Sequence, residues 1–310
     1  MKKFTLLLTL LSLLIANTAF AQYNRAAGRS APVVEREMQV FDAQTGETST
    51  KVVRVAPDRD RFGNAAGTDF DLAVDGAFEG NTVAVIQLYD FSFEDARAAL
   101  KQKGFSVYRW RHAPPSPEEL EKKLKKASQL WIISGDRRLL NEKHLAVIKK
   151  FFDSGKGLYI WGDNTPYHAD ADYVASALFD SSMAGTYWGD QVVAMKTEGQ
   201  KAGVLPNHLL STGLENIFEG ITIAEINVVG GLTPFIWSSD GNVVTAIYDR
   251  GGKRAILDGG FTRLYNKWDT AGTGRYVKNA AAWLVNVERF GDDVVAIKST
   301  GDDAKKPADQ

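Results

Sequence analysis

The sequence predicts an α/β protein built on a mostly parallel sheet with helices on both faces. Three observations lead to this prediction. Between residues 82 and 161, short apolar runs recur that are typical of strands buried on both faces. Single amphipathic segments separate these runs, and turn or capping residues mark the junctions. Strands that alternate with single helices imply right-handed parallel crossovers, so we expect a sheet that is covered twice.

The first strand is expected at residues 82–88 (TVAVIQL), a continuous apolar run. Ser92 is expected to cap the next helix, with Asp95 completing a weak capping box, and Gly104 is expected to end it. Three further strands are expected at residues 105–110 (FSVYRW), 129–134 (QLWIIS) and 157–161 (GLYIW).

Two helices are expected between these later strands. Ser116 and Pro117 occupy the positions of an N-cap and a first helical residue, so a helix should run from there to about Ala127. Asn141 is expected to cap a helix that continues through Phe152.

Beyond residue 181 the pattern becomes less regular and predicts an irregular β-rich extension. Short strands are expected at residues 191–196, 221–229, 235–237 and 243–248. Residues 254–261 (RAILDGGF) give a last buried strand, and residues 274–287 give a last helix. The whole is expected to be a flavodoxin-like or Rossmann-like core with an antiparallel addition.

The N-terminal segment predicts export. Residues 1–21 contain two lysines, an apolar run and the small-x-small pattern of a signal peptidase site, so we expect a signal peptide and a periplasmic or secreted product. No later stretch approaches the roughly 20 apolar residues of a transmembrane helix, so no membrane span is expected. The chain has no cysteine, which excludes disulfides, thiol chemistry and a lipid-anchored cysteine.

Three further segments complete the expected organisation. Residues 22–80 form a polar N-terminal arm, and the alternation around Gln44, Thr45 and Gly46 predicts a hairpin in it. The arm is a candidate docking element for an envelope protein partner. Residues 81–290 form the α/β domain, and residues 299–310 are expected to be disordered.

The charge pattern gives little support to nucleic-acid binding. No basic stripe interleaved with aromatic residues occurs, and the balance is mildly acidic once the two signal lysines are removed. The lysine-rich residues 121–127 (EKKLKKA) are better explained as the solvated side of an amphipathic helix. We therefore expect no nucleic-acid partner.

A junction between a buried strand and a helix lies at residues 157–174 (GLYIWGDNTPYHADADYV), with Asp163 at its centre. In three-layer α/β proteins such a turn often presents a nucleophile. Asp163 would then need a histidine to activate water, and His168 and His208 are the candidates. A carboxylate here can also accept backbone N–H bonds at the helix start or contact a ligand, together with Asn164 and Tyr167, so the three roles remain open.

Four side chains that can bind a metal lie within a stretch of ten residues at this junction, namely Asp163, His168, Asp170 and Asp172. Their spacing lacks the loop pattern of a calcium site, and the helix dipole favours carboxylates in a first turn without any ion. We expect no metal, and nothing in the sequence points to a cofactor.

A second polar cluster spans residues 257–276 (LDGGFTRLYNKWDTAGTGRY). The glycines after Asp258 would let the backbone approach a ligand, and the residues before the last helix, including Thr273, could hold an anion or a sugar hydroxyl. Arg263 and Arg275 would supply charge. The candidate ligand-binding residues of both turns are Asp163, Asn164, Tyr167, Asp258, Thr262, Arg263, Trp268, Thr273 and Arg275. The alternative is structural: Thr273 caps the helix, glycines make turns, and the arginines pair with Asp258 or Asp269.

Aromatic residues accompany both turns, and exposed tyrosine and tryptophan are suited to stacking on sugar rings. They are Trp161, Tyr167, Tyr187, Trp188, Trp237, Tyr265 and Trp268. Such residues are also ordinary core material in an exported protein without disulfides. Ligands of open α/β sheets bind beyond the carboxyl ends of the strands, where both turns belong. We therefore expect a carbohydrate or another small polar ligand, if any.

The chain resembles the class I glutamine amidotransferase-like superfamily, and within it the extracytoplasmic and ThuA-like members. The resemblance is carried by residues 134–136 (SGD), 140–157 (LNEKHLAVIKKFFDSGKG), 157–164 (GLYIWGDN) and 207–220 (NHLLSTGLENIFEG). In the amidotransferases the turn between this strand and the next helix, called the elbow, presents a cysteine that is activated by a histidine. Here it holds Gly162, Asp163 and Asn164, and neither a cysteine nor a late His-x-Glu pair exists, which excludes that reaction.

The resemblance therefore implies a flavodoxin-like, amidotransferase-like domain without its nucleophile. We expect an exported binding or scaffolding module. One alternative is a hydrolase that uses Asp163 with His168 or His208. A second is a component of an envelope assembly that docks through the arm.

Overall fold

The computed structural model describes residues 23–24, 27–28, 33–267 and 272–287. The expected signal peptide (1–21) and the expected disordered tail (299–310) lie outside these residues, as does Trp268. The strands are β1 (Val34–Phe41), β2 (Thr48–Val55), β3 (Thr82–Gln87), β4 (Ser106–Arg111), β5 (Gln129–Ile133), β6 (Gly157–Trp161), β7 (Met183–Trp188), β8 (Val192–Ala194), β9 (Gly203–Val204), β10 (Asn216–Phe218), β11 (Thr222–Ile226), β12 (Thr233–Trp237), β13 (Val243–Arg250) and β14 (Lys253–Asp258). The helices are α2 (Glu94–Gln102), α3 (Pro117–Leu124), α4 (Glu142–Asp153), α5 (Ala169–Phe179) and α6 (Thr273–Val285), with 3-10 turns η1 (Leu209–Ser211) and η2 (Phe261–Leu264).

The central sheet has eight strands in the order β4-β3-β5-β6-β14-β13-β12-β9. The first five strands pair in parallel, and the other three pair antiparallel. In chain order the parallel strands read 2-1-3-4-5, which is the flavodoxin-like order. The predicted fold class is therefore confirmed: a flavodoxin-like sheet with an antiparallel, β-rich extension.

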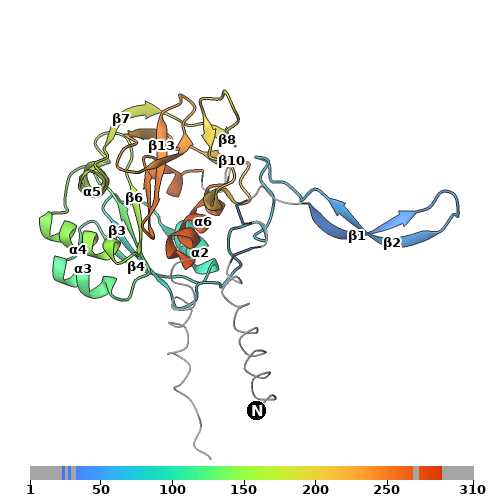
Figure 1. Cartoon of the computed structure of the whole chain (residues 1–310), viewed down its shortest axis with the longest axis horizontal. Coiled ribbons are helices and arrows are strands. Elements are labelled where there is room, and N and C mark those ends of the chain that lie inside the picture. The colour runs from blue at the N-terminus through green and yellow to red at the C-terminus, as the bar shows by residue number, and fades with distance from the viewer. Residues whose placement is uncertain (1–22, 25–26, 29–32, 268–271, 288–310) are drawn as a thin grey trace, which may run out of the picture.

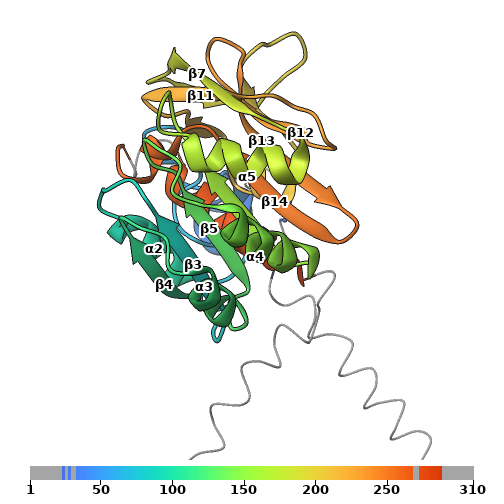
Figure 2. The ribbon, with the colours of Figure 1, turned by 90° about the vertical axis from the view of Figure 1, so that its left-hand side faces the viewer.

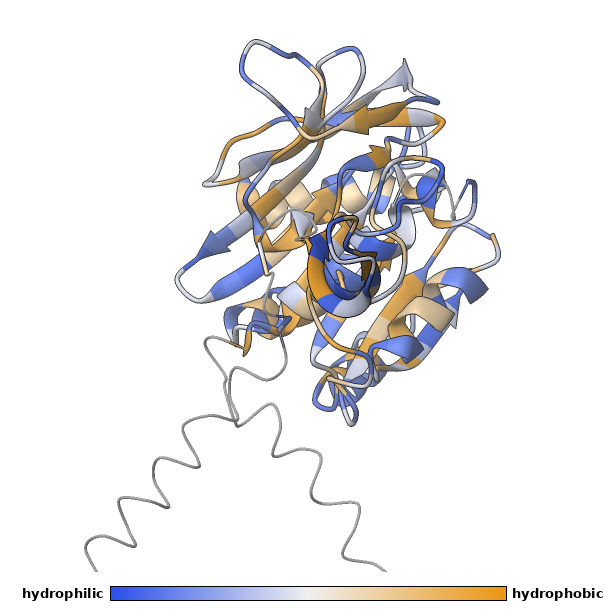
Figure 3. Ribbon diagram, turned by 90° about the vertical axis from the view of Figure 1, so that its right-hand side faces the viewer, coloured by the Kyte–Doolittle hydropathy of each residue, from blue (hydrophilic) through white to orange (hydrophobic). Residues whose placement is uncertain are grey.

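Two apolar cores lie on opposite faces of this sheet. Alternate residues of each parallel strand point to opposite sides, so Val85 and Trp131 join one core while Ile86 and Ile132 join the other. Helices α2 and α6 cover the first core (Figure 1). Helices α3, α4 and α5 cover the second, on the side that faces the viewer in Figure 2. Figure 3 shows apolar residues concentrated in the interior elements, with hydrophilic residues along the outer loops.

Helix starts follow local capping chemistry, with one exception. Ser116 accepts a hydrogen bond from the Glu119 N–H at 3.2 Å, and Asn141 caps α4, both as predicted. The Ser92 prediction is wrong: the N-cap of α2 is Phe93, with no side-chain cap. Phe93 is 1% exposed and packs in the core covered by α2 and α6, so α2 begins at a buried apolar residue and not at a polar cap.

The predicted strands of the extension all occur, and the sequence missed three more. Strands β8, β11, β12 and β13 lie at the predicted positions, whereas β7, β9 and β10 were not predicted. Strand β7 pairs with β11, and β10 pairs with β8, in two small antiparallel sheets. These strands gather at the top of Figure 1, beyond the carboxyl end of the parallel sheet.

The predicted hairpin occurs as β1 and β2, which pair from Val34↔Val55 to Phe41↔Thr48. It projects away from the body of the molecule (Figure 1). The rest of the predicted arm behaves differently, because Leu72, Ala77 and Phe78 are buried in the core covered by α2 and α6. The projecting element is thus the hairpin, while residues 70–78 are part of the domain.

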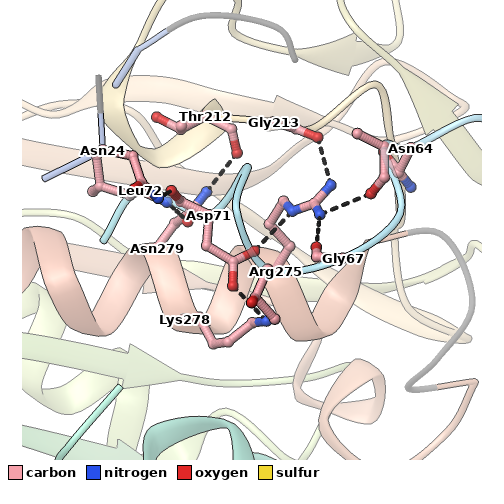
Figure 4. Close-up of polar contacts among 12 residues, drawn as sticks. Asn24, Asn64, Gly67, Asp71, Leu72, Thr212, Gly213, Arg275, Lys278 and Asn279 are labelled. Atoms are coloured by element: carbon pink, nitrogen blue, oxygen red, sulfur yellow. Dashed lines mark hydrogen bonds and ion pairs between the residues drawn. The ribbon is translucent and has the colours of Figure 1, made fainter. Parts of the chain in front are cut away.

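A buried carboxylate fixes this segment to the domain. Asp71 is fully buried and contacts three cations: Lys103 at 2.9 Å, Lys278 at 2.6 Å and Arg275 at 2.9 Å. Two of them come from α6, as Figure 4 shows. Arg275 also donates to the carbonyl of Gly213 at 2.8 Å and to that of Ala65 at 2.8 Å.

No helix in the described part of the chain is long and apolar enough to cross a membrane.

Replacing Asp71 tests the importance of this cluster. Asp71→Asn leaves three neighbouring cations without their shared counter-charge, so we expect unfolding in urea to show a loss of about 3–5 kcal/mol. The control is Asp75→Asn, because Asp75 pairs with Lys103 at 2.6 Å but is 47% exposed. A surface pair of that kind contributes about 0–1 kcal/mol. Equal losses for the two variants would contradict this account.

Candidate functional site

The predicted strand-to-helix junction lies at the carboxyl end of the parallel sheet. Strand β6 ends at Trp161, residues 162–168 form the turn, and α5 follows. The neighbouring strand β14 ends at Asp258 and leads into η2, so both predicted turns meet at this edge. Backbone bonds continue the pairing past the strand ends: Gly162 N–H donates to Asp258 O at 2.8 Å, and Phe261 N–H donates to Gly162 O at 3.0 Å.

Asp163 joins these two turns and is only 1% exposed. Its Oδ2 accepts from the Thr262 N–H at 3.0 Å, and its Oδ1 accepts from the Asn164 N–H at 2.9 Å. Burial disfavours the charged form more than these bonds favour it, so the pKa of Asp163 rises from 3.8 to about 7. Because each oxygen of Asp163 accepts a hydrogen bond from a backbone N–H group, the carboxyl group is bound as a structural carboxylate would be.

Asp258, at the end of β14, and Arg263, in η2, form a second buried polar cluster. Both are fully buried, and their charged groups are 3.4 Å apart. The same carboxylate accepts from the hydroxyls of Tyr276 at 3.2 Å and Thr245 at 3.1 Å, and burial raises its pKa. Arg263 donates to the carbonyl of Glu219 at 2.7 Å. We assign both residues a structural role in place of the ligand contact expected from sequence, and the predicted pairing of Arg263 with Asp258 is confirmed.

The glycines after Asp258 serve close packing within the chain. A Cβ at Gly259 would lie 2.2 Å from the carbonyl oxygen of Ala224, and one at Gly260 would lie 2.8 Å from that of Glu219. Both contacts are far too short for a side chain. The close approach expected for a ligand is thus made by the chain's own backbone. Thr262 also takes part, because its hydroxyl accepts from the Ile221 N–H at 3.1 Å.

The histidines do not complete a catalytic pair with Asp163. His208 lies before η1, packed against the rings of Phe235 and Trp283, and its Nδ1 accepts from the Leu210 N–H at 3.1 Å. Burial lowers the pKa of His208 to about 4. His168 packs beside Gly162, and its Nδ1 is buried without a partner. Within the described residues, neither imidazole makes a hydrogen bond or ion pair with the Asp163 carboxylate.

The neighbouring carboxylates bind backbone N–H groups of other segments. Asp170 Oδ1 accepts from the N–H groups of Leu139 at 2.9 Å and Leu140 at 2.7 Å. Asp172 accepts from the Met183 N–H at 2.9 Å. The two carboxylates hold different loops, and the described residues contain no group of three or more metal-ligating side chains.

A cluster of aromatic rings covers the Asp163 turn. It is made of Tyr89, Phe91, Tyr167, Phe261 and Tyr265, which come from the segments after β3, β6 and β14. Ring centroids lie 5.0 Å apart for Tyr89 and Tyr167, and 4.5 Å apart for Phe91 and Tyr265. We call these five residues the aromatic cluster. All except Phe261 are half-buried, so their rings are partly open to solvent.

The environment of the aromatic cluster raises the pKa of one of its tyrosines. Burial is the largest cause that raises the pKa of Tyr265, and the nearby Tyr89, Asp163 and Tyr167 raise it further. Sequence reasoning found Tyr167 and Tyr265 but missed Tyr89, Phe91 and Phe261. For Tyr89 and Phe91 the only signal was position, since both follow the predicted strand 82–88 at the edge where ligands bind, whereas Phe261 was predicted as the last residue of a strand.

The remaining predicted residues are dispersed. Asn164 accepts from the Thr222 hydroxyl at 2.8 Å beside the turn. Thr273 and Arg275 lie on α6, and Arg275 pairs with Asp71. Asp269, the other predicted arginine partner, lies outside the described residues. Thr273 is the first helical residue and not the N-cap, which is Gly272. Trp161 is core material, and Trp188 is 66% exposed on β7.

No protein-family model and no curated protein matches this chain. Solved structures of similar fold include a ThuA-like protein from Bacteroides uniformis (TM-score 0.46, 11% identity, covering 66% of this chain and 91% of that one) and another from Parabacteroides merdae (0.42, 11%, 67% and 90%). A glutamine amidotransferase from Thermotoga maritima is a third (0.37, 11%, 71% and 95%). Similarity this low carries no argument about activity, so the function is argued from the chain's own residues.

The pH dependence of stability tests the state of Asp163. Because its folded pKa lies above its unfolded pKa, its stabilising contribution is complete below about pH 4 and is lost as the pH rises through about 7. At about 1.4 kcal/mol per pKa unit, the loss amounts to at most about 4 kcal/mol. Asp163→Asn mimics the neutral acid, so the parent should lose stability relative to this variant between pH 4 and 7 in urea unfolding. A pH-independent difference between the two proteins would contradict the buried, neutralised carboxyl.

Proposed function

We propose that this chain is an exported, non-catalytic binding module with an amidotransferase-like fold. The observation that carries the proposal is the burial and hydrogen bonding of Asp163, in the turn between β6 and α5. The carboxylate of Asp163 is buried, and each of its oxygens accepts a backbone N–H. A nucleophile needs an exposed, activated atom and a base within hydrogen-bond reach, and the described contacts of Asp163 include neither. The hydrolase alternative with His168 or His208 is therefore the less supported of the two.

We further propose that the ligand is a carbohydrate or another small polar molecule and that it contacts the aromatic cluster. Three partly open tyrosines, from different turns, lie at the edge where open α/β sheets bind ligands. Their rings offer flat apolar surface, and their hydroxyls offer donors and acceptors. This combination suits a sugar ring, which has apolar C–H faces and a polar rim.

The ring substitutions test this proposal. Binding of a panel of monosaccharides and oligosaccharides to the full chain would be followed by tryptophan fluorescence and calorimetry. Tyr167→Ala and Tyr265→Ala should each weaken binding by about two- to tenfold, as expected for loss of one stacked ring. Tyr108→Ala is the control, because Tyr108 is 37% exposed on β4, outside the cluster. Loss of binding in the control alone, or in none of the variants, would refute the assignment.

The hairpin supports a second candidate function, docking in an envelope assembly. It projects from the body and exposes Met38, Phe41 and Val52 at 47%, 65% and 64% (Figure 1). An isolated two-stranded sheet is only marginally stable in water, and its edges offer unpaired backbone groups to another chain. Replacing residues 35–54 by a short Gly-Ser turn should release the protein from an envelope fraction if the hairpin docks there. Unchanged fractionation would count against this function.

A further inference from the structure

A groove of about 900 Å³ lies between α2, the first turns of α6 and residues 60–67. It is separate from the aromatic cluster, since none of the five cluster residues lines it. Its cationic lining residues are Lys101, Arg275 and Lys278, and its acidic ones are Asp60 and Asp95. The groove is open at Gly67, where an added Cβ would meet no atom within 4 Å.

The N-terminus of a regular helix faces this groove. Helix α6 has 13 residues, and Gly272, its N-cap, lines the groove together with Gly274. Gly272 carries no side chain, and within the described part of the chain no side-chain cap accepts the first N–H groups of the helix. These N–H groups point along the helix axis and add the positive end of the helix dipole. Such an end favours an anion, although by itself it does not make a site.

Two buried donors lie near the start of α6. Asn64 is 1% exposed, and Thr273, the first residue of α6, is 0% exposed and does not line the groove. Among the described residues, neither Asn64 Nδ2 nor Thr273 Oγ1 has a hydrogen-bond partner. Asn64 lines the groove, and its Nδ2 would lie 3.1 Å from a Cβ at Gly272. The amide orientation is fixed, because Oδ1 accepts from the N–H groups of Glu215 at 2.7 Å and Asn216 at 2.9 Å. Buried polar atoms are nearly always paired, so two unpaired donors beside one helix start indicate a missing acceptor.

The charges around the groove balance. Lys101, Lys103, Arg275 and Lys278 are matched by Asp60, Asp71, Asp75 and Asp95. Asp60 Oδ1 accepts from the N–H groups of Phe62 at 2.8 Å and Asn64 at 3.0 Å. The case for an anion therefore rests on the unpaired donors and the helix start.

We infer that Asn64, Thr273 and the first N–H groups of α6 bind a small oxyanion, a phosphate or carboxylate group that enters from the groove. The anion oxygens accept from Asn64 Nδ2, the Thr273 hydroxyl and the helix N–H groups, and Lys278 contributes charge. The site does not depend on the aromatic cluster, so the two assignments succeed or fail separately.

Inorganic phosphate is the first probe, titrated against the full chain by calorimetry and by thermal unfolding, with potassium chloride at matched ionic strength. Thr273→Val keeps the shape of the side chain and removes a hydroxyl that has no partner. Asn64→Asp keeps the Oδ1 acceptor and replaces the free donor by an anionic oxygen. Ser238→Ala is the matched control, because Ser238 Oγ is also buried and unpartnered among the described residues, but Ser238 directly follows β12 and does not belong to the start of α6.

We expect phosphate to bind the parent and Ser238→Ala equally and to raise their Tm by mass action. Thr273→Val should bind about tenfold more weakly, as expected for loss of one hydrogen bond to a charged group, with Tm unchanged in chloride alone. Asn64→Asp should show no saturable binding. Acetate tested in parallel distinguishes a carboxylate from a phosphate site.

Three outcomes would overturn the inference. Phosphate and acetate that both fail to bind the parent would remove the site. Equal Tm increases in all four proteins would reflect the general effect of an excluded salt. A lower Tm for Thr273→Val in chloride would show that the hydroxyl is structural.

Discussion

The carboxyl edge of the sheet depends on the bonds that tie the turn after β6 to the turn after β14. Asp163 Oδ2 accepts from the Thr262 N–H at 3.0 Å, and Phe261 N–H donates to Gly162 O at 3.0 Å. The same two turns carry Tyr167 and Phe261 of the aromatic cluster, so this link sets how far apart the rings lie. Asp163 thus acts as a structural support for the aromatic cluster.

Two buried carboxylates illustrate how differently such a group can be stabilised. Asp71 contacts three cations, which hold residues 70–78 on α2 and α6. Asp163 has two neutral N–H donors and the more remote charge of Arg263, so desolvation dominates and raises its pKa to about 7. The first arrangement fixes the fold through charge. The second fixes a turn and leaves a carboxyl that is partly neutral near pH 7.

The sequence predicted whatever depends on local pattern. The apolar runs predicted β3, β5 and β6, and short-range capping chemistry predicted the starts of α3 and α4. Contacts between distant segments left no such signal: Arg275 pairs with Asp71 across 204 residues, and Gly259 packs against Ala224. Both polar turns were recognised because their glycine and polar residues form a local pattern. Which of their residues are buried supports, which join the aromatic cluster and which lie at the α6 groove depends on contacts between distant segments, and the sequence did not show it.

Residue-resolved hydrogen exchange of the Thr262 amide tests the central claim most directly, because that N–H is the donor to Asp163. If the carboxyl supports the junction, the amide should exchange as slowly as the amides of β6 and β14, with an opening free energy near that of global unfolding. In Asp163→Ala it should exchange much faster while the strands remain protected. Exchange of the parent amide at the rate of an exposed loop would contradict the structural role of Asp163 and reopen the case for a reactive group at this elbow.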